Sequence, residues 1–153
     1  MTTITEYLDG IISITGGDQK RYYEWVRKKG RNFLCRNKIR EHELVLKCEP
    51  HKRRECYYNS QSIVLGSNIY DYYEGWYIPS GLFPLEHGFV VYNSQVVDVT
   101  ANNRIVEEYF GVKIPKRFVW ETWNRTMHAP PLIADWWSQS QKGVKKTMMK
   151  NGG

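Results

Sequence analysis

The stretch EHGFVVYNSQVVDVT, residues 86–100, decides how the rest of the chain is interpreted. Two runs rich in valine flank Asn93 and Ser94, a pair suited to a tight two-residue turn. The pattern predicts a β-hairpin in which Val91 faces Val96. A slip of one residue would turn every side chain of one strand to the opposite face. The register is therefore a definite geometric prediction.

Two polar residues of this hairpin share a face in the predicted register. His87 and Asp98 become diagonal neighbours on adjacent strands, about 7–8 Å apart between backbones, which is within reach of a side-chain hydrogen bond. Aspartate is depleted in strands and costly to bury without a partner. Asp98 therefore needs a partner, and His87 is the natural one.

A cysteine stands at the start of a helical segment upstream. The sequence ECYYNSQSIVLG predicts a helix over 55–65 that ends at Gly66. A cysteine in the first turn, as Cys56 is here, lies at the positive end of the helix dipole, which favours the thiolate. We expect the inner side of this helix to cover the hairpin face that holds Phe89 and Val91.

These three residues have the chemistry of one nucleophilic site. Cys56 would attack, His87 would act as the base that takes its proton, and Asp98 would hold the imidazole in place. The alternatives are a purely structural His–Asp pair and a zinc site, for which no fourth ligand is evident. Cys35 and Cys48 are interpreted as small buried hydrophobic residues.

The order of a cysteine helix, a histidine strand and an aspartate strand resembles the papain-like superfamily, especially its compact transglutaminase-like core. HGFVVYNSQVVDVT is similar to the H-(aliphatic)…(V)-D-(P)-T signature, ECYYNSQ resembles the nucleophile segment, and EEYFGVKIP resembles the stretch that trails the aspartate. The resemblance covers roughly residues 52–115. It implies a thiol-dependent amide or ester hydrolase or acyltransferase, similar to a peptidase or amidase, that works through a Cys56-His87-Asp98 triad and a thioester intermediate.

The sequence departs from this family pattern at several positions. Val99 follows the aspartate where proline is common, and Gly88 follows the histidine where larger residues are usual. Pro50 stands six residues before Cys56, where papain-type enzymes have a glutamine. The oxyanion hole is therefore unassigned beyond the backbone N–H of Cys56. Three side chains are candidates for the second donor: Asn59, Gln61 and Tyr73.

Further candidate site residues follow from position alone. We expect Asn59, Tyr73 and Trp76 to contact substrate, although packing within a sheet explains the two aromatic residues equally well. The other three histidines are interpreted as surface residues: His42, His51 and His128.

The predicted architecture is α+β, papain-like or transglutaminase-like, with a central antiparallel sheet packed against the nucleophile helix. Strands are predicted over 69–78, 86–92 and 95–101. Helices are predicted over 19–29 with Asp18 as N-cap, over 55–65, over 103–111, after the extended residues 112–115, and as a last helix or turn over 132–140. The chain is read as a single domain with three parts: a helical N-terminal part (1–50), a catalytic core (52–115) and an aromatic C-terminal part with a frayed basic tail (116–153).

Composition limits the classes of partner. The chain has 153 residues and a net charge of +6, with a pI of about 9.2. A basic balance admits nucleic acid as a partner without favouring it, because no zinc-finger, homeodomain or RNA-binding signature accompanies the charge. The alternative to an enzyme is an inactive chain that acts as a basic nucleic-acid- or protein-binding module or as an inhibitor.

Targeting signals and cofactor motifs do not stand out in the sequence. Three cysteines without a C-x-x-C pair argue against a disulfide framework. The sequence shows neither a signal peptide nor an apolar run near the ~18 residues that a membrane helix needs. We therefore expect a cytoplasmic protein that uses no cofactor and no membrane, with a peptide, amide or acyl substrate.

Overall fold

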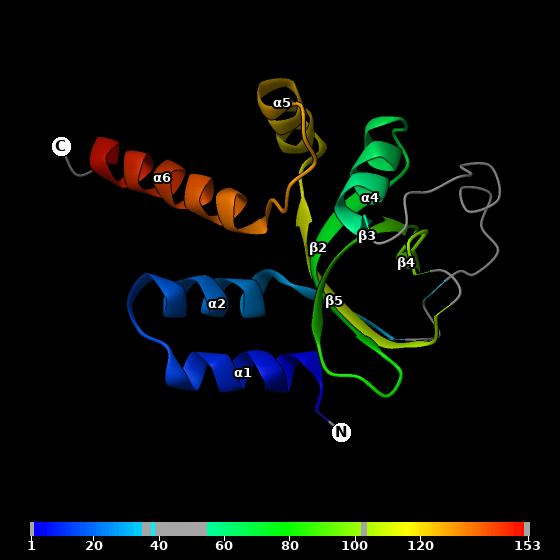
Figure 1. Ribbon diagram of the computed structural model, residues 1–153. Helices are drawn as coiled ribbons and strands as arrows, with labels where there is room; N and C mark the ends of the chain where they lie inside the picture. The colour runs from blue at the N-terminus through cyan, green and yellow to red at the C-terminus, as the bar shows by residue number, and fades with distance from the viewer. Residues whose placement is uncertain (1, 35–37, 39–54, 102–103, 152–153) are drawn as a thin grey trace.

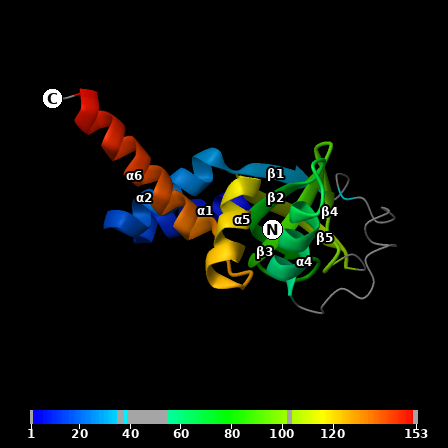
Figure 2. The same ribbon diagram turned by 90° about the horizontal axis from the view of Figure 1, so that it is seen from above.

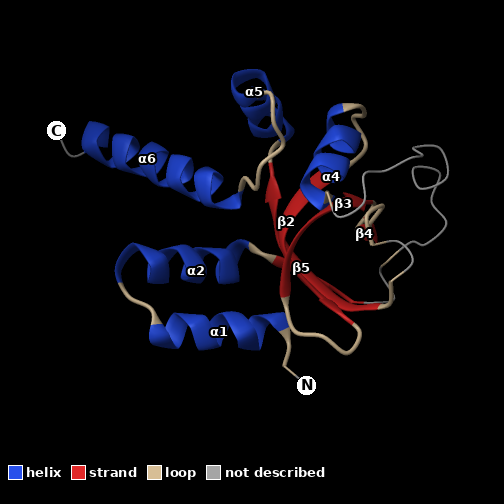
Figure 3. Cartoon of the chain, in the orientation of Figure 1, coloured by secondary structure: helices blue, strands red, loops and turns tan. Residues whose placement is uncertain are grey.

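The computed structural model describes residues 2–34, 38, 55–101 and 104–151, with side chains up to residue 143. Within these residues the chain is α+β, as predicted: five helices surround one curled antiparallel sheet (Figures 1 and 3). Helices α1 (Ile4–Ile14), α2 (Gly17–Lys29) and α6 (Ile133–Asn151) gather at one end of the molecule (Figure 2). Helix α4 (Cys56–Leu65) lies at the other end, beside β3 (Leu85–Tyr92) and β4 (Gln95–Val97).

The sheet has the strand order β1-β5-β2-β3-β4, and all neighbours are antiparallel. Its strands are β1 (Arg31–Leu34), β2 (Asp71–Pro79), β3 (Leu85–Tyr92), β4 (Gln95–Val97) and β5 (Val106–Ile114). Strand β1 pairs with β5, so the description of residues 1–50 as a helical part was incomplete. The N-terminal third supplies one edge strand of the same sheet.

The hairpin of β3 and β4 has the predicted register. Val91 faces Val96 and Tyr92 faces Gln95. The two turn residues have positive φ angles, 50° for Asn93 and 64° for Ser94. Positive φ at both central positions matches the twist of the flanking strands, which is why this pair of residues closes the hairpin in this register.

The helices of the described chain are α1 (Ile4–Ile14), α2 (Gly17–Lys29), α4 (Cys56–Leu65), α5 (Lys116–Thr126) and α6 (Ile133–Asn151). Gly66 caps α4 at its C-terminus, as predicted. The N-cap of α2 is Gly16, and the predicted cap Asp18 lies in the first turn instead, where its charge suits the helix dipole. Helix α6 continues through most of 142–153, which was expected to be a frayed tail.

The predicted helix over 103–111 was wrong, because residues 106–111 belong to β5. Strand β5 lies between β1 and β2 and is buried on both faces, so its sequence lacks a simple alternation of apolar and polar residues. The register with β2 also shifts between Ile78 and Pro79, where a bulge inserts one residue. That extra residue breaks the two-residue period and produces a spacing that resembles a helix.

One face of the sheet closes on itself, and we call it the inner face. Its core residues are Phe33, Tyr73, Tyr77, Phe89, Val91, Val96, Ala101, Val106 and Tyr109. The rings of Phe33 in β1 and Phe89 in β3 lie 6.0 Å apart, although two strands separate them, which is about 14 Å in a flat sheet. A Cβ atom on Gly75 would lie 2.1 Å from the carbonyl oxygen of Phe110. Only glycine permits so close an approach of β2 and β5.

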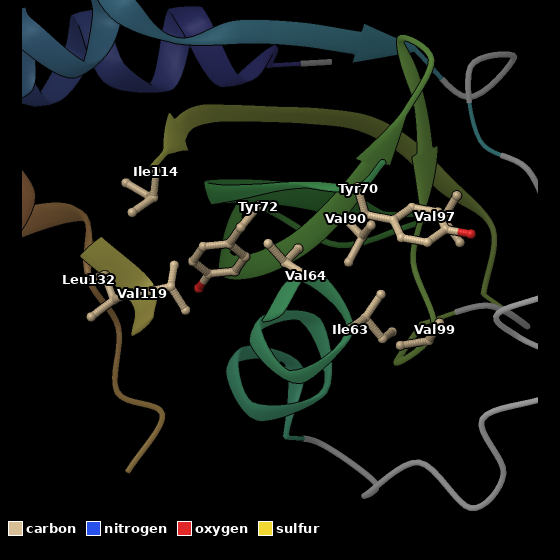
Figure 4. Close-up of a cluster of buried hydrophobic side chains, with 10 residues drawn as sticks. All are labelled: Ile63, Val64, Tyr70, Tyr72, Val90, Val97, Val99, Ile114, Val119 and Leu132. Carbon is tan, nitrogen blue, oxygen red and sulfur yellow. The ribbon is translucent and has the colours of Figure 1, made fainter. Parts of the chain in front are cut away.

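The opposite, helix-covered face carries Tyr72, Glu74, Trp76 and Val90. Helix α4 packs its Ile63 and Val64 onto this face, against the residues drawn in Figure 4. The prediction that α4 covers Phe89 and Val91 was therefore wrong. Those side chains point to the inner face and are covered by aromatic residues of the other strands, because the sheet curls.

Several predictions lie outside the described residues. They concern residues 39–50, whose sequence is compatible with either a short helix or a strand, and four side chains: Cys35, Cys48, His42 and His51.

Candidate active site

The predicted hydrogen bond between the two hairpin residues is present. His87 Nε2 lies 2.7 Å from Asp98 Oδ2, and the two residues are 3% and 0% exposed. Strand β4 ends at Val97, so Asp98 follows the last paired residue and keeps the side-chain direction of the inner face. The strand register predicted from the sequence therefore places the His87 and Asp98 side chains in contact.

Asp98 has further donors that hold its carboxylate. The Tyr109 hydroxyl donates to Oδ2 over 2.8 Å, and the backbone N–H of Ala101 donates to Oδ1 over 3.1 Å. Burial opposes ionisation, but the charge and hydrogen bond of His87 and these two donors outweigh it and lower the pKa of Asp98. Tyr109 was missed in the sequence because its strand was expected to be a helix.

One face of the His87 imidazole packs against an aromatic ring. Its ring stacks on Tyr77 with 3.9 Å between centroids. Burial disfavours the charged ring, but the charge and hydrogen bond of Asp98, with a further hydrogen bond and charge interaction from Cys56, raise the pKa of His87 to about 9. His87 is therefore an imidazolium at neutral pH.

Cys56 is the first residue of α4 and is half-buried. Its side chain lies close enough to His87 to help raise the pKa of the imidazole. Because Asp98 occupies Nε2, the ring nitrogen left for another partner is Nδ1. The helix begins at Cys56, so the backbone N–H of Cys56 is one of the first four that have no acceptor within the helix. The imidazole and the helix N-terminus thus both adjoin this thiol.

Helix α4 reaches His87 although it packs on the opposite face of the sheet. Strand β4 pairs with only the last three residues of β3, which leaves the edge of β3 beside His87 to the first turns of α4. Ser60 Oγ donates to the carbonyl oxygen of Gly88 over 3.1 Å, and Asn59 Nδ2 donates to Thr100 Oγ1 over 3.0 Å. These bonds tie the helix to both sides of the hairpin.

Gly88 has a steric role at this contact. A Cβ atom at this position would lie 2.9 Å from Cδ1 of Tyr57 and 3.0 Å from the hydroxyl of Tyr72. Glycine therefore lets the first turn of α4 approach β3, which explains the small residue after the histidine.

Other candidates from the sequence have structural roles. The amide of Gln61 is buried and bonded to the Tyr72 hydroxyl, the carbonyl of Pro130 and the indole N–H of Trp123, so it is not an oxyanion donor. Tyr73 is buried against Phe33 on the inner face. Its contacts are those of sheet packing.

The two remaining substrate-binding candidates differ in position. Asn59 lies one helical turn from Cys56 but is 2% exposed and bonded to Thr100. Trp76 lies on the helix-covered face, the opposite side of the sheet from His87, and packs near Tyr23. His128 is exposed, as predicted.

A groove of about 540 Å³ is lined by Glu55 and Tyr57, the residues on either side of Cys56 in the sequence. Tyr58 stacks on Trp123 of α5 in its wall, with 5.7 Å between ring centroids. The groove was not predicted, although the two tyrosines after Cys56 and the MHAPP turn were visible in the sequence. Its lining residues are Glu55, Tyr57, Tyr58, Trp123, Met127, His128, Ala129 and Pro130.

The geometry of the three residues does not suit a metal ion. His87 Nε2 is taken up by the carboxylate of Asp98, which also accepts from Tyr109 and Ala101. Among the residues that the structure describes, no group of three or more His, Cys, Asp or Glu side chains is arranged to hold a metal.

Comparisons of this chain with protein families, with curated proteins and with solved structures found no match. No helix within the described part of the chain is both long enough and apolar enough to cross a membrane.

Proposed function

We propose that the chain is a thiol-dependent hydrolase or acyltransferase for amide or ester bonds, with a papain-like, transglutaminase-like fold. The observation that carries the proposal is the buried His87–Asp98 pair with Cys56 near the ring, at the first residue of α4. A buried imidazole between a carboxylate and a thiol at a helix N-terminus is an arrangement for activating a nucleophile.

The reaction begins with the sulfur of Cys56 as a thiolate. The sulfur attacks the carbonyl carbon of the substrate and forms a C–S bond, and the carbonyl oxygen becomes an oxyanion that the backbone N–H of Cys56 stabilises. His87, held as an imidazolium by Asp98, gives its proton to the leaving nitrogen or oxygen as the C–N or C–O bond breaks. The product of this half-reaction is a thioester on Cys56.

The second half-reaction releases the acyl group. Water or an acceptor amine attacks the thioester carbonyl, neutral His87 takes a proton from it, and the C–S bond breaks to restore the thiolate of Cys56. The groove beside Cys56 offers Tyr58 and Trp123 as contacts for the acyl part of the substrate. Hydrolysis and acyl transfer use the same groups and differ in the acceptor.

Selective alkylation of Cys56 tests this proposal. Iodoacetamide is applied between pH 5 and 9, and the adducts on the three cysteines are located by peptide mass, with Cys35 and Cys48 as internal references. We expect Cys56 to react selectively at pH values well below ~8.5, where an ordinary thiol becomes reactive. His87→Ala should abolish this low-pH reactivity.

Two controls sharpen the alkylation experiment. Cys56→Ser should remove the fast adduct without changing the slow labelling of the other cysteines. His128→Ala, which changes an exposed histidine of the groove wall, should leave the low-pH limb of the Cys56 profile in place. Equal, slow labelling of all three cysteines in the wild-type protein would refute the proposal.

A further inference from the structure

A second, smaller hollow lies on the other side of Tyr57 from the substrate groove. Its volume is about 100 Å³, and Tyr57 lines both hollows. Its walls combine three aromatic side chains with two carboxylates. The residues that matter here are Tyr22, Tyr57, Trp76, Glu74 and Glu86.

This hollow adjoins the candidate active site through the chain itself. Tyr57 follows Cys56 directly, and Glu86 precedes His87 directly. Gly75, which also lines the hollow, pairs with His87 across β2 and β3. Glu86 pairs with Trp76 and shares its helix-covered face, whereas His87 points to the inner face. The connection to Cys56 therefore runs through Tyr57, which lines both hollows, and a substrate whose reacting carbonyl lies at Cys56 can place a side group here past Tyr57.

The hollow brings two carboxyl groups together in a protein whose net charge is +6. Neither Glu74 nor Glu86 forms an ion pair with any lysine, arginine or histidine of the described chain. Burial raises the pKa of Tyr22 and of Tyr57, and the charges of both glutamates raise them further.

The shape and the walls narrow the class of ligand. A water molecule occupies about 30 Å³ of liquid, so the hollow holds roughly three groups of that size. Aromatic faces attract cations, most strongly when the cation is partly desolvated. A small cationic head at the end of an unbranched chain fits these conditions, whereas an anion or a bulky ring does not.

We propose that this hollow is a specificity subsite for a lysine-like alkylammonium group on the substrate, with Glu86 at its rim as the selecting carboxylate. The inference rests on the proposed function, since it assigns a substrate class to the same site. Glu74 lies at its base and the aromatic rings of Tyr22, Tyr57 and Trp76 form its sides.

The subsite can be probed without a known substrate. Alkyl methanethiosulfonates modify Cys56 as the thiolate displaces methanesulfinate and forms a mixed disulfide, and the alkyl end can carry an ammonium, a methyl or a sulfonate group. The measured quantity is the ratio of the Cys56 rate constants for the ammonium and the methyl reagents of equal length. Each rate constant is divided by that of a cysteine peptide, which removes intrinsic differences in reactivity.

We expect the wild-type ratio to be about five to ten and to fall as salt is added, from the usual strengths of cation–π contacts and exposed ion pairs. Glu86→Gln should lower it about threefold. Glu24→Gln changes the net charge equally on the exposed side of α2, outside the hollow, and should leave the ratio as it is.

The possible outcomes separate the two proposals. A ratio near one, or a ratio that Glu86→Gln and Glu24→Gln lower equally, overturns the subsite. A guanidinium reagent that clearly outruns the ammonium reagent overturns the lysine-like assignment. Cys56 that reacts no faster than the cysteine peptide with the methyl reagent at pH 6 overturns the activated nucleophile, while the ratio still tests the subsite.

Discussion

The two faces of the sheet each bury a carboxylate, and the two differ in their partners. On the inner face Asp98 contacts a histidine that carries a positive charge, so its pKa is lowered. On the helix-covered face Glu74 accepts from neutral donors: the Tyr72 hydroxyl at 2.6 Å and the backbone N–H groups of Leu132 at 2.8 Å and Ile133 at 3.0 Å. Burial outweighs these three bonds and raises the pKa of Glu74 to about 7.

The difference shows what sets the charge of a buried acid in this fold. Both carboxylates have several hydrogen bonds, so the number of donors does not separate them. The two carboxylates differ in whether a hydrogen-bonding partner can carry a positive charge, as His87 does for Asp98. The inner face therefore holds a permanent ion pair suited to catalysis, whereas the other face holds an acid that gains or loses a proton near neutrality.

Removing Asp98 should have the largest effect. Asp98→Ala leaves His87, the Tyr109 hydroxyl and the Ala101 N–H without their common partner, and we expect the free energy of unfolding to fall by about 3–5 kcal/mol at pH 6. Urea unfolding followed by tryptophan fluorescence measures this loss. A loss below 1 kcal/mol would contradict the buried ion pair.

The pH dependence of an isosteric variant sharpens this test. The pKa of His87 is about 9 in the folded state against 6.5 unfolded, so its contribution is full below pH 6.5 and is lost as the pH rises through 9. The stability difference between wild type and Asp98→Asn should therefore shrink over this window. A difference that grows with pH would show that the ring is neutral.

Glu74 should give an intermediate effect. Its pKa is raised from 4.5 to about 7 on folding, so its contribution is full below pH 4.5 and is lost as the pH rises through 7, by about 3 kcal/mol in total. Glu74→Gln should remove this slope from the stability curve measured by urea unfolding between pH 4.5 and 8. Glu24→Gln, on the exposed side of α2, should keep it, and equal slopes in both variants would refute the assignment to Glu74.

An exposed carboxylate of the same sheet should have the smallest effect. Asp71 pairs with Lys113 at 3.5 Å, and both side chains are about half exposed to water. Asp71→Asn should lower the free energy of unfolding by less than about 1 kcal/mol, and added salt should reduce the difference further. A loss comparable with that of Asp98→Ala would mean that burial is not what separates these carboxylates.

The sequence was sufficient for the hairpin and for its polar pair. Asn93 and Ser94 allow few turn geometries, and the turn fixes the register that brings His87 and Asp98 together. The α+β class and the extent of α4 followed from equally local signals.

The remaining features depend on contacts between distant segments. The sheet curls where Gly75 approaches β5 closely, so aromatic residues of other strands cover Phe89 in place of α4. The bulge in β5 breaks the two-residue period of the sequence, so the strand that supplies Tyr109 to the site was not predicted. The hydrogen bond from the backbone N–H of Leu132 to Glu74 joins residues 58 positions apart, which no pattern of neighbouring residues indicates.

The place of β5 in the sheet also sets the order in which the site can form. Strand β1 emerges early during synthesis, but within the described strands its sheet neighbour is β5, which emerges after β2, β3 and β4. The hairpin can bring His87 to Asp98 from local contacts, whereas the Tyr109 bond and the closed inner face require the last strand. A chain stopped before residue 106 therefore carries its cysteine without the finished surroundings, and full reactivity should arise only late in folding.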